Sequence, residues 1–172
     1  MLQSFCKRKG RSITEASQNA ALTVKKLIDK KMKITFAESC TGGLAAAELV
    51  AVPDASKVFD GSFVTYAEKL KTALVGVPAA DIEKYGVVST EVAEKMASGC
   101  AEGLNCEVGV GITGYAGPTG GTENAPVGTV CFGFYVNGAV KSFTKHFGSI
   151  GRNEVRRQSV EFVFATLCDI LE

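Results

Sequence analysis

The sequence has very little of what a protein metal site needs. His146 is the only histidine among 172 residues, and the six cysteines include no C-x-x-C pair. Because zinc and iron sites are usually built from closely spaced imidazole and thiolate groups, we expect no metal site and no metal or redox cofactor. The single histidine also weakens any Ser-His-Asp or Cys-His interpretation. For His146 itself, a partly exposed structural position is the better expectation.

The chain also lacks an excess of charge and a long apolar run. With 19 lysines and arginines against 18 aspartates and glutamates, the net charge is +1, so the composition gives no sign of a basic surface for nucleic acid. The uncharged apolar runs are too short to cross a bilayer. Scattered cysteines without paired spacing are typical of reduced, mostly buried thiols. We therefore expect a cytoplasmic protein that has neither nucleic acid nor a membrane as its partner.

The length of 172 residues fits one domain with a substantial core. Residues 1–11 contain four basic residues and no acidic one, so we expect a mobile basic tail there, with a transit-peptide fragment as the alternative. Residues 12–172 are expected to form the domain. Its apolar helices favour a homo-oligomer.

The periodicity of the apolar residues predicts alternating helices and strands. Helices are expected over residues 13–31, 44–50, 67–75, 80–85, 89–104 and 153–171. Strands are expected over residues 34–37, 58–66, 106–112, 127–136 and 139–147. Asn137-Gly138 separates the last two strands and is the strongest hairpin signal in the chain. This order predicts a three-layer α/β/α single domain whose mixed, mostly parallel sheet has about five strands.

The most informative stretch runs from Lys33 to Gly43. An apolar run over residues 34–37 predicts a buried strand, and Glu38-Ser39-Cys40-Thr41-Gly42-Gly43 then leads directly into a helix. The unpaired N–H groups at the start of a helix suit an anion, either a phosphate or the oxyanion of acyl transfer. The alternative is that Ser39 or Thr41 only caps the helix.

A serine nucleophile needs another base where histidine is lacking, and lysine is the usual substitute. Lysine acts as a base only when burial or nearby positive potential lowers its pKa. Lys71 lies five residues after Tyr66, so a helical turn could bring both toward a cleft beside Ser39. The alternative for Lys71 is a solvated helix face. Cys40 ranks well below Ser39 as a nucleophile because no imidazole is expected near it.

A glycine-rich segment follows the third predicted strand. Gly109-Val110-Gly111-Ile112-Thr113-Gly114 matches the dinucleotide-binding pattern G-x-G-x-x-G, but it lies largely within the predicted strand and no helix follows it. A dinucleotide site is therefore not expected. The loop over residues 113–122 is so rich in glycine that we expect it to be functional.

Several segments of the chain, taken together, resemble one protein family. In order, they are Ala37-Glu38-Ser39-Cys40-Thr41-Gly42-Gly43, Tyr66 with Lys71, Leu74-Val75-Gly76-Val77, Gly86-Val87-Val88-Ser89, residues 113–121, Pro126-Val127-Gly128-Thr129-Val130, and Arg152 with Arg156. From about Ser12 to its end, the chain resembles the C-terminal domain of CinA-type proteins, including stand-alone nicotinamide mononucleotide amidohydrolases. Agreement of several unrelated segments in order is far more specific than any one of them.

The resemblance implies an amidohydrolase that converts the carboxamide of nicotinamide mononucleotide, its small-molecule substrate, to nicotinate mononucleotide and ammonia. It implies that Ser39 is the nucleophile, that Lys71 is its general base, and that Tyr66 passes or stabilises the proton between them. The residues implied to bind the substrate are Cys40, Thr41, Gly42, Gly43, Thr113, Gly114, Gly117 and Arg152. Among these, N–H groups around Thr41 and Gly42 would hold the oxyanion, and Arg152 would bind the phosphate. An exposed arginine near a helix N-terminus is the alternative for Arg152.

Departures from the family pattern leave two rival functions open. The chain has Tyr66-Ala67-Glu68 where the family usually has Tyr-Ser-Asn or Tyr-Thr-Asn, and Glu68 could raise the pKa of Lys71. Tyr115 and Thr119 stand where smaller or aliphatic residues are common. The first rival is a nucleotide-binding module that has lost hydrolysis. The second rival is an interaction or regulatory protein connected with DNA uptake or damage. The near-neutral net charge does not support it, because DNA binding usually needs a basic surface.

Overall fold

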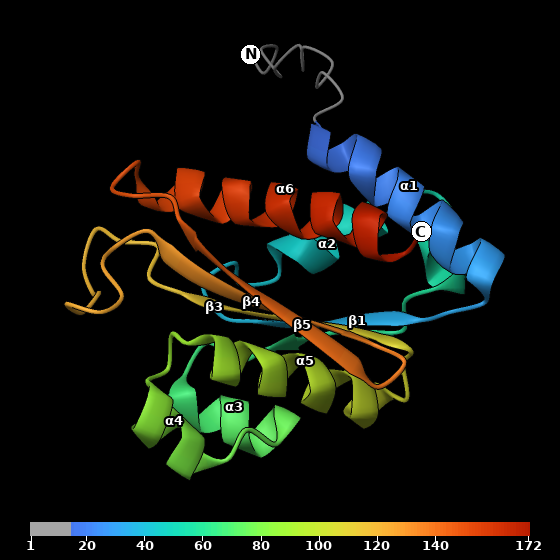
Figure 1. Cartoon of the computed structure of the whole chain (residues 1–172). Helices are drawn as coiled ribbons and strands as arrows, with labels where there is room; N and C mark the ends of the chain where they lie inside the picture. Colours follow the sequence, from blue (N-terminus) through green and yellow to red (C-terminus); the bar gives the residue numbers. More distant parts are fainter. Residues whose placement is uncertain (1–14) are drawn as a thin grey trace, which may run out of the picture.

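Residues 15–172 are described by the computed structural model (Figure 1), and the basic tail predicted over residues 1–11 lies outside them. The helices are α1 (Glu15–Lys30), α2 (Leu44–Val50), α3 (Glu68–Val75), α4 (Ala79–Tyr85), α5 (Thr90–Leu104) and α6 (Arg152–Ile170). The strands are β1 (Ile34–Glu38), β2 (Phe63–Val64), β3 (Val108–Gly114), β4 (Thr129–Val136) and β5 (Ala139–His146). Each predicted helix and strand corresponds to one of these elements.

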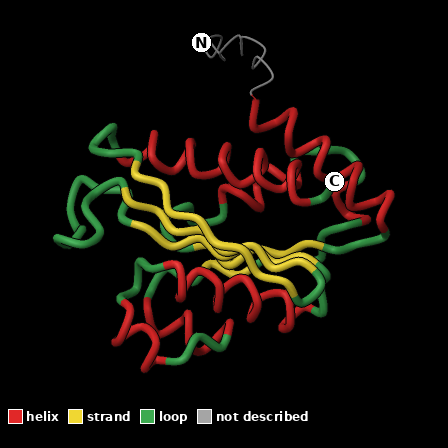
Figure 2. The backbone as a smooth tube through the Cα atoms, viewed as in Figure 1, coloured by secondary structure: helices red, strands yellow, loops and turns green. Residues whose placement is uncertain are grey.

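The strands form one five-stranded sheet in the order β2-β1-β3-β4-β5. β1 pairs in parallel with β2 and β3, whereas β4 pairs antiparallel with β3 and β5, so β4 runs against the other strands. Helices α1, α2 and α6 cover one face of the sheet, and α3, α4 and α5 lie on the other (Figure 1, Figure 2). The predicted three-layer α/β/α domain with a mixed sheet is confirmed.

The hairpin predicted at Asn137-Gly138 joins β4 to β5. Asn137 and Gly138 have φ angles of 48° and 91°, and Val136 pairs directly with Ala139 across the turn. Positive φ at both central residues is the backbone of a type I′ turn, which matches the right-handed twist of paired strands. The local sequence therefore determines the register of the sheet edge.

The strand predicted over residues 58–66 is much shorter than expected. Only Phe63–Val64 form β2, and Ala55–Lys57 form a single 3-10 turn before it. Val58 is buried, and its carbonyl accepts the N–H of Ile34 at 2.8 Å. Val58 is thus buried as a strand residue would be, but the prediction of a strand over residues 58–62 was wrong.

The core lies on both faces of the sheet. The larger cluster, beneath α1, α2 and α6, includes Phe36, Phe132, Phe134 and Phe164. On the other face, Gly109 and Gly111 let α5 approach β3 closely, since an added Cβ would lie 2.1 Å from the Ala97 carbonyl oxygen and 2.2 Å from that of Ala93. The G-x-G part of the dinucleotide pattern is therefore a packing feature of β3.

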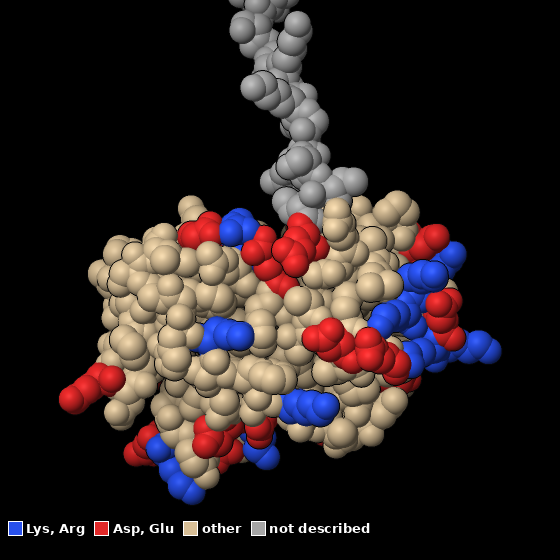
Figure 3. Space-filling view, turned by 45° about the horizontal axis from the view of Figure 1, so that its top comes forward, with Lys and Arg blue, Asp and Glu red and all other residues tan. Residues whose placement is uncertain are grey.

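The surface of the described domain carries both signs of charge. On the face shown in Figure 3, acidic and basic side chains are interspersed, as the balanced composition predicts. Within residues 15–172, no helix combines the length and the apolar character that a membrane span requires.

Candidate active site

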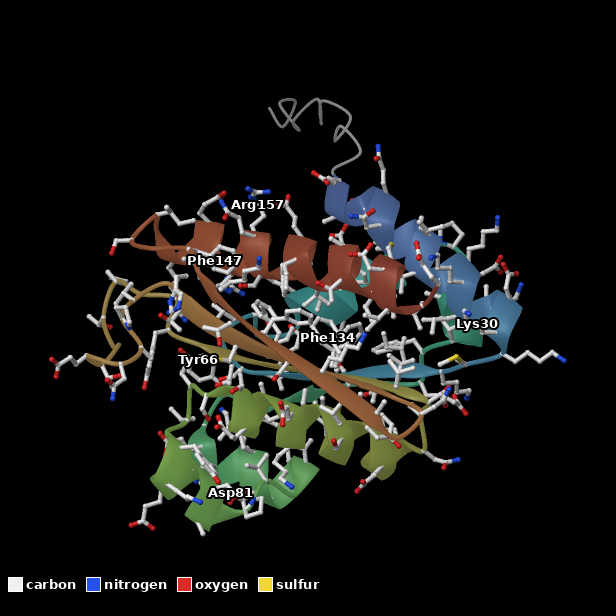
Figure 4. All side chains as sticks on the ribbon, in the orientation of Figure 1. Lys30, Tyr66, Asp81, Phe134, Phe147 and Arg157 are labelled. Atoms are coloured by element: carbon white, nitrogen blue, oxygen red, sulfur yellow. The ribbon has the colours of Figure 1, made fainter. Side chains whose placement is uncertain are left out.

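A cavity of about 290 Å³ lies at the carboxyl ends of the parallel strands β1, β2 and β3. Ser39 directly follows β1, Tyr66 follows β2, and Gly114 ends β3. Figure 4 shows Tyr66 at this edge of the sheet. Ligand sites of α/β sheets commonly lie here. The cavity is lined by Ser39, Cys40, Tyr66, Glu68, Lys71, Val87, Val88, Thr113, Gly114, Tyr115, Ala116, Thr119, Gly120 and Arg152.

The cavity contains a buried serine–lysine pair. The Lys71 Nζ atom donates a hydrogen bond of 3.1 Å to the Ser39 hydroxyl and one of 2.8 Å to the Thr65 carbonyl. Lys71 is only 1% exposed, and it shares the inner face of α3 with Val75. The alternative of a solvated helix face for Lys71 was therefore wrong. The spacing in the sequence predicted that Lys71 lies near the cleft. Its burial depends on tertiary packing, which the spacing does not report.

Burial determines the acid–base character of Lys71. Removal from water disfavours the ammonium form and lowers the pKa of Lys71 below its usual value, while the charge of Glu68 and the thiol of Cys40 oppose that shift. Glu68 is exposed at the cavity, and the ion pairs among residues 15–172 do not include Glu68 with Lys71. Glu68 thus raises the pKa of Lys71, as predicted, but it does so through its charge at a distance and without a direct ion pair.

The other candidate nucleophile, Cys40, has the opposite character. It lines the cavity, but burial raises the pKa of its thiol to about 12. A thiol with such a pKa stays protonated near neutral pH, which agrees with ranking it below Ser39. His146 does not line this cavity; it lies exposed on β5, where its Nδ1 is 3.1 Å from the Thr129 hydroxyl.

The start of α2 is capped by a side chain that the sequence pattern did not single out. The N-cap residue of α2 is Gly43, and no hydroxyl caps the helix, so the alternative that Ser39 or Thr41 is the cap was wrong. Instead, the fully buried Glu38 carboxylate accepts the N–H groups of Gly43 at 2.9 Å, Ala45 at 3.2 Å and Ala46 at 2.9 Å. Glu38 was predicted to lie in the turn after the strand and was given no role, whereas the structure includes it as the last residue of β1.

The turn between β1 and α2 contributes fewer groups to the cavity than predicted. Ser39 and Cys40 line it, whereas Thr41, Gly42 and Gly43 do not, and Gly117 of the later loop does not either. The Gly42 N–H donates to the Ser39 carbonyl at 3.0 Å. Within residues 15–172, no oxygen acceptor is assigned to the N–H groups of Cys40 and Thr41. The oxyanion role of this turn stays a prediction, and these two N–H groups are its available donors.

Tyr66 and Arg152 meet at the mouth of the cavity. Tyr66 is 61% exposed, and its hydroxyl accepts a hydrogen bond of 3.1 Å from Arg152. Arg152 also donates to the Gly117 carbonyl at 3.0 Å. No hydrogen bond in the described part of the chain joins Tyr66 to Ser39 or Lys71. The proton-transfer role of Tyr66 stays a prediction that this geometry does not support.

The glycine-rich loop forms the far wall. Thr113 and Gly114 line the cavity as predicted, and the Thr113 hydroxyl donates to the Val87 carbonyl at 2.8 Å. Val87 and Val88 also line it, although sequence reasoning gave them no role. The signal that could have found them is Gly86-Val87-Val88-Ser89, a segment that matched the family pattern without an assigned chemistry.

These features define a three-layer α/β domain with a serine–lysine pair at the carboxyl edge of its parallel strands. The chain belongs to the CinA C-terminal domain family, whose model matches residues 16–171. It is 46% identical to a CinA-like protein of Dictyoglomus thermophilum over 130 aligned residues, and the aligned region covers 76% of this chain and 31% of that protein. It is 41% identical to a CinA-like protein of Prochlorococcus marinus over 143 aligned residues, and the aligned region covers 82% of this chain and 33% of that protein. The chain thus spans about a third of the length of these relatives.

Solved structures agree with this assignment. The fold matches a competence/damage inducible protein from Agrobacterium tumefaciens with a TM-score of 0.88 at 31% identity, covering 92% of this chain and 97% of that one. It matches a competence-damaged protein (CinA) superfamily protein from Escherichia coli with a TM-score of 0.87 at 31% identity, covering 94% of this chain and 99% of that one.

Proposed function

We propose that this domain hydrolyses the carboxamide of nicotinamide mononucleotide to nicotinate mononucleotide and ammonia. The observation that carries the proposal is the 3.1 Å hydrogen bond between the Lys71 amine and the Ser39 hydroxyl inside a cavity. Burial lowers the pKa of Lys71, which favours the neutral amine that a general base needs. The substrate itself comes from the resemblance to stand-alone amidohydrolases.

The reaction proceeds in two halves. Ser39 Oγ attacks the carboxamide carbon while its proton moves to the neutral Lys71 amine, and a tetrahedral oxyanion forms. The C–N bond then breaks, and the leaving nitrogen takes the proton from Lys71, so that ammonia departs and an ester on Ser39 remains. In the second half, water attacks the ester while Lys71 takes its proton. Lys71 returns that proton to Ser39 Oγ, and the carboxylic acid product is released and ionises.

The remaining groups of the site divide between the two ends of the substrate. The N–H group of Cys40, which lines the cavity, and that of Thr41, which follows it in the chain, stabilise the oxyanion. Thr113, Gly114 and Gly120 line the part of the cavity that takes the ribose. Arg152, an exposed guanidinium at the mouth, binds the phosphate.

Ammonia release from nicotinamide mononucleotide tests the proposal. We expect Ser39→Ala and Lys71→Ala each to reduce turnover on the order of a thousandfold or more, because the pair acts as a unit. Lys69→Ala is the matched control, since Lys69 is an exposed lysine of the same helix and does not line this cavity. Turnover that survives Ser39→Ala would remove the nucleophile assignment.

A second candidate function is a nucleotide-binding module that no longer hydrolyses its ligand. It is favoured by Ala67 and Glu68, which replace the usual hydroxyl and amide, and by the bond of the Tyr66 hydroxyl to Arg152. Calorimetric binding of nicotinamide mononucleotide by the native chain, without ammonia release, would establish this function in place of the first.

A further inference from the structure

Two charged side chains of opposite sign hold the backbone around Ser39. We propose that Glu38 and Arg156 are positioning residues that fix the turn over residues 39–43, and so set the Ser39 hydroxyl against Lys71. This inference rests on the proposed function, in which Ser39 is the nucleophile. Neither side chain lines the cavity, so neither is expected to touch the substrate.

Glu38 holds the side of the turn that continues into α2. One carboxylate oxygen accepts the N–H groups of Gly43 and Ala45, and the other accepts that of Ala46. A carboxylate accepting several backbone N–H groups makes stronger hydrogen bonds than a neutral acceptor does, and it is stabilised further by the helix N-terminus. Glu38 is 0% exposed, so its orientation is also fixed by packing. The N–H groups of the N-cap residue and of the second and third residues of α2 are therefore directed to Glu38.

Arg156 reaches the same turn from α6. Its Nε donates to the Cys40 carbonyl at 3.1 Å, and its Nη2 donates to the Thr41 carbonyl at 3.0 Å. Its Nη1 donates to Asn153 Oδ1 at 3.1 Å, which orients the planar guanidinium. A rigid fork of donors can bridge two successive carbonyls, whereas a lysine ammonium on a flexible stem cannot match both.

The contacts of Arg156 also constrain the orientation of the peptide units in the turn. In a trans peptide unit the N–H and the C=O point in opposite directions. Arg156 binds the Cys40 carbonyl, so the Thr41 N–H of the same peptide unit points away from Arg156. Gly42 and Gly43 have φ angles of 59° and 94°, which glycine adopts without steric strain but also leaves freely. Charged partners on both sides restrict this freedom.

Kinetics of conservative variants test the positioning role. Glu38→Gln keeps the volume but replaces one acceptor oxygen with an NH₂ group that faces backbone donors. We expect kcat for ammonia release to fall about a hundredfold with KM changed less than about twofold, since a misplacement near 1 Å has effects of that size. Arg156→Lys keeps the charge and should reduce kcat about tenfold. All assays are run well below the unfolding temperature of each variant, where a purely structural role leaves kcat unchanged.

Matched controls exist for both variants. Glu48→Gln alters a carboxylate of α2 that bonds to Ser17 and does not touch the turn. Arg157→Lys alters the neighbouring arginine, which pairs with Glu154 and Glu161. Both controls should keep native kinetics. If Glu38→Gln fails to fold, Arg156→Lys, whose side chain is only half-buried, carries the test.

A second measurement separates this inference from the proposed substrate. Phenylmethanesulfonyl fluoride sulfonylates activated serines, and mass spectrometry gives the rate at which Ser39 is labelled. We expect Glu38→Gln and Arg156→Lys to slow labelling by the same factors as kcat. Native labelling rates in both variants would overturn the positioning role, whether or not ammonia is released. Slowed labelling in a protein that releases no ammonia would support the positioning role and overturn the substrate assignment. A native Ser39 that is not labelled, in a chain that also releases no ammonia, would overturn both.

Discussion

The two segments that face each other across the cavity are held in very different ways. The turn over residues 39–43 is fixed by a buried carboxylate, a guanidinium and a backbone bond from the Ser39 N–H to the Ile112 carbonyl. The loop after β3 exposes Pro118, Thr119 and Gly120, and Arg152 holds its Gly117 carbonyl from an exposed position. The proposed nucleophile therefore belongs to a firmly held segment, and the opposite wall of the cavity belongs to a more exposed and adaptable one.

This difference separates the geometry of reaction from the recognition of the substrate. A turn whose carbonyls and following N–H groups are bound by charged side chains is restricted in conformation, because moving it breaks several strong hydrogen bonds at once. An exposed loop can change its side chains without such a penalty, which fits the presence of Tyr115 and Thr119 where the family usually has smaller or aliphatic residues. Changes on the rigid side should act on kcat, and changes on the adaptable side should act on KM.

The largest effect is expected from replacing the buried base. Lys71→Met should reduce turnover on the order of a thousandfold or more while keeping the side-chain volume. It should also change how stability depends on pH. Because the folded-state pKa of Lys71 is lowered from its usual 10.5, the lysine destabilises the fold fully below its folded pKa, and this effect is lost as the pH rises through 10.5.

Urea unfolding of both proteins at pH 7 and at pH 10.5 measures that dependence. The stability of Lys71→Met relative to the native chain should be greater at pH 7, by up to about 1.4 kcal/mol for each unit by which burial lowers the pKa. Lys69→Met provides the exposed control, for which the difference should not vary with pH. An equal difference at both pH values for Lys71→Met would mean that the lysine titrates normally in the fold.

A smaller effect is expected from adding one methyl group on each side of the cavity. Gly42 and Gly120 have φ angles of 59° and 87°, so alanine is strained at both positions by about 1–2 kcal/mol. An added Cβ would lie 3.7 Å from Arg156 at Gly42 and 3.2 Å from the Tyr115 ring at Gly120. We expect Gly42→Ala to reduce kcat about tenfold and Gly120→Ala to raise KM a few-fold with kcat nearly unchanged. Steady-state kinetics of both variants with nicotinamide mononucleotide check this. A change in KM for Gly42→Ala and in kcat for Gly120→Ala would contradict the proposed difference between the two sides of the cavity.

The sequence predicted the fold well because most of its signals are local. Alternating apolar residues located the strands, and Asn137-Gly138 determined the hairpin. The strand over residues 58–66 failed because the pattern reports burial and not backbone pairing, and the carbonyl of Val58 binds Ile34 outside the ladder. The backbone conformation of residues 58–62 depends on how they meet β1, which the local sequence pattern does not specify.

The candidate site could be predicted only in part. Ser39 and Lys71 were found as residue types at a suitable spacing, and the structure brings them together. Glu38 and Arg156 were not assigned their roles, because the capping preference at helix starts pointed to the hydroxyls of Ser39 and Thr41 and because Arg156 reaches the turn from 115 residues along the chain. The burial of Lys71 could not be predicted either, because it depends on how α3 packs in the folded domain.

The smallest effect concerns the charge that opposes the shift of Lys71. Glu68 is exposed at the start of α3, outside both the turn over residues 39–43 and the loop after β3, and its charge raises the pKa of Lys71 against the lowering caused by burial. Glu68→Gln should therefore lower the pKa of Lys71 further, so that more of the neutral base is present near neutral pH. The acidic limb of the kcat/KM profile should move to lower pH by roughly 0.3 units, as expected for a single screened charge.

The pH profile of ammonia release at low and high salt distinguishes this charge effect from a change in binding. Raising the ionic strength to about 1 M shortens the screening length to about 3 Å, so the native and Glu68→Gln profiles should converge. Glu83→Gln, an exposed carboxylate of α4 that does not line the cavity, should leave the profile in place. A limb that moves to higher pH in Glu68→Gln would mean that Glu68 acts on Lys71 by orienting it and not by its charge. An exposed residue outside the turn would then help to determine the geometry of the reaction, and the turn over residues 39–43 would no longer be what sets that geometry by itself.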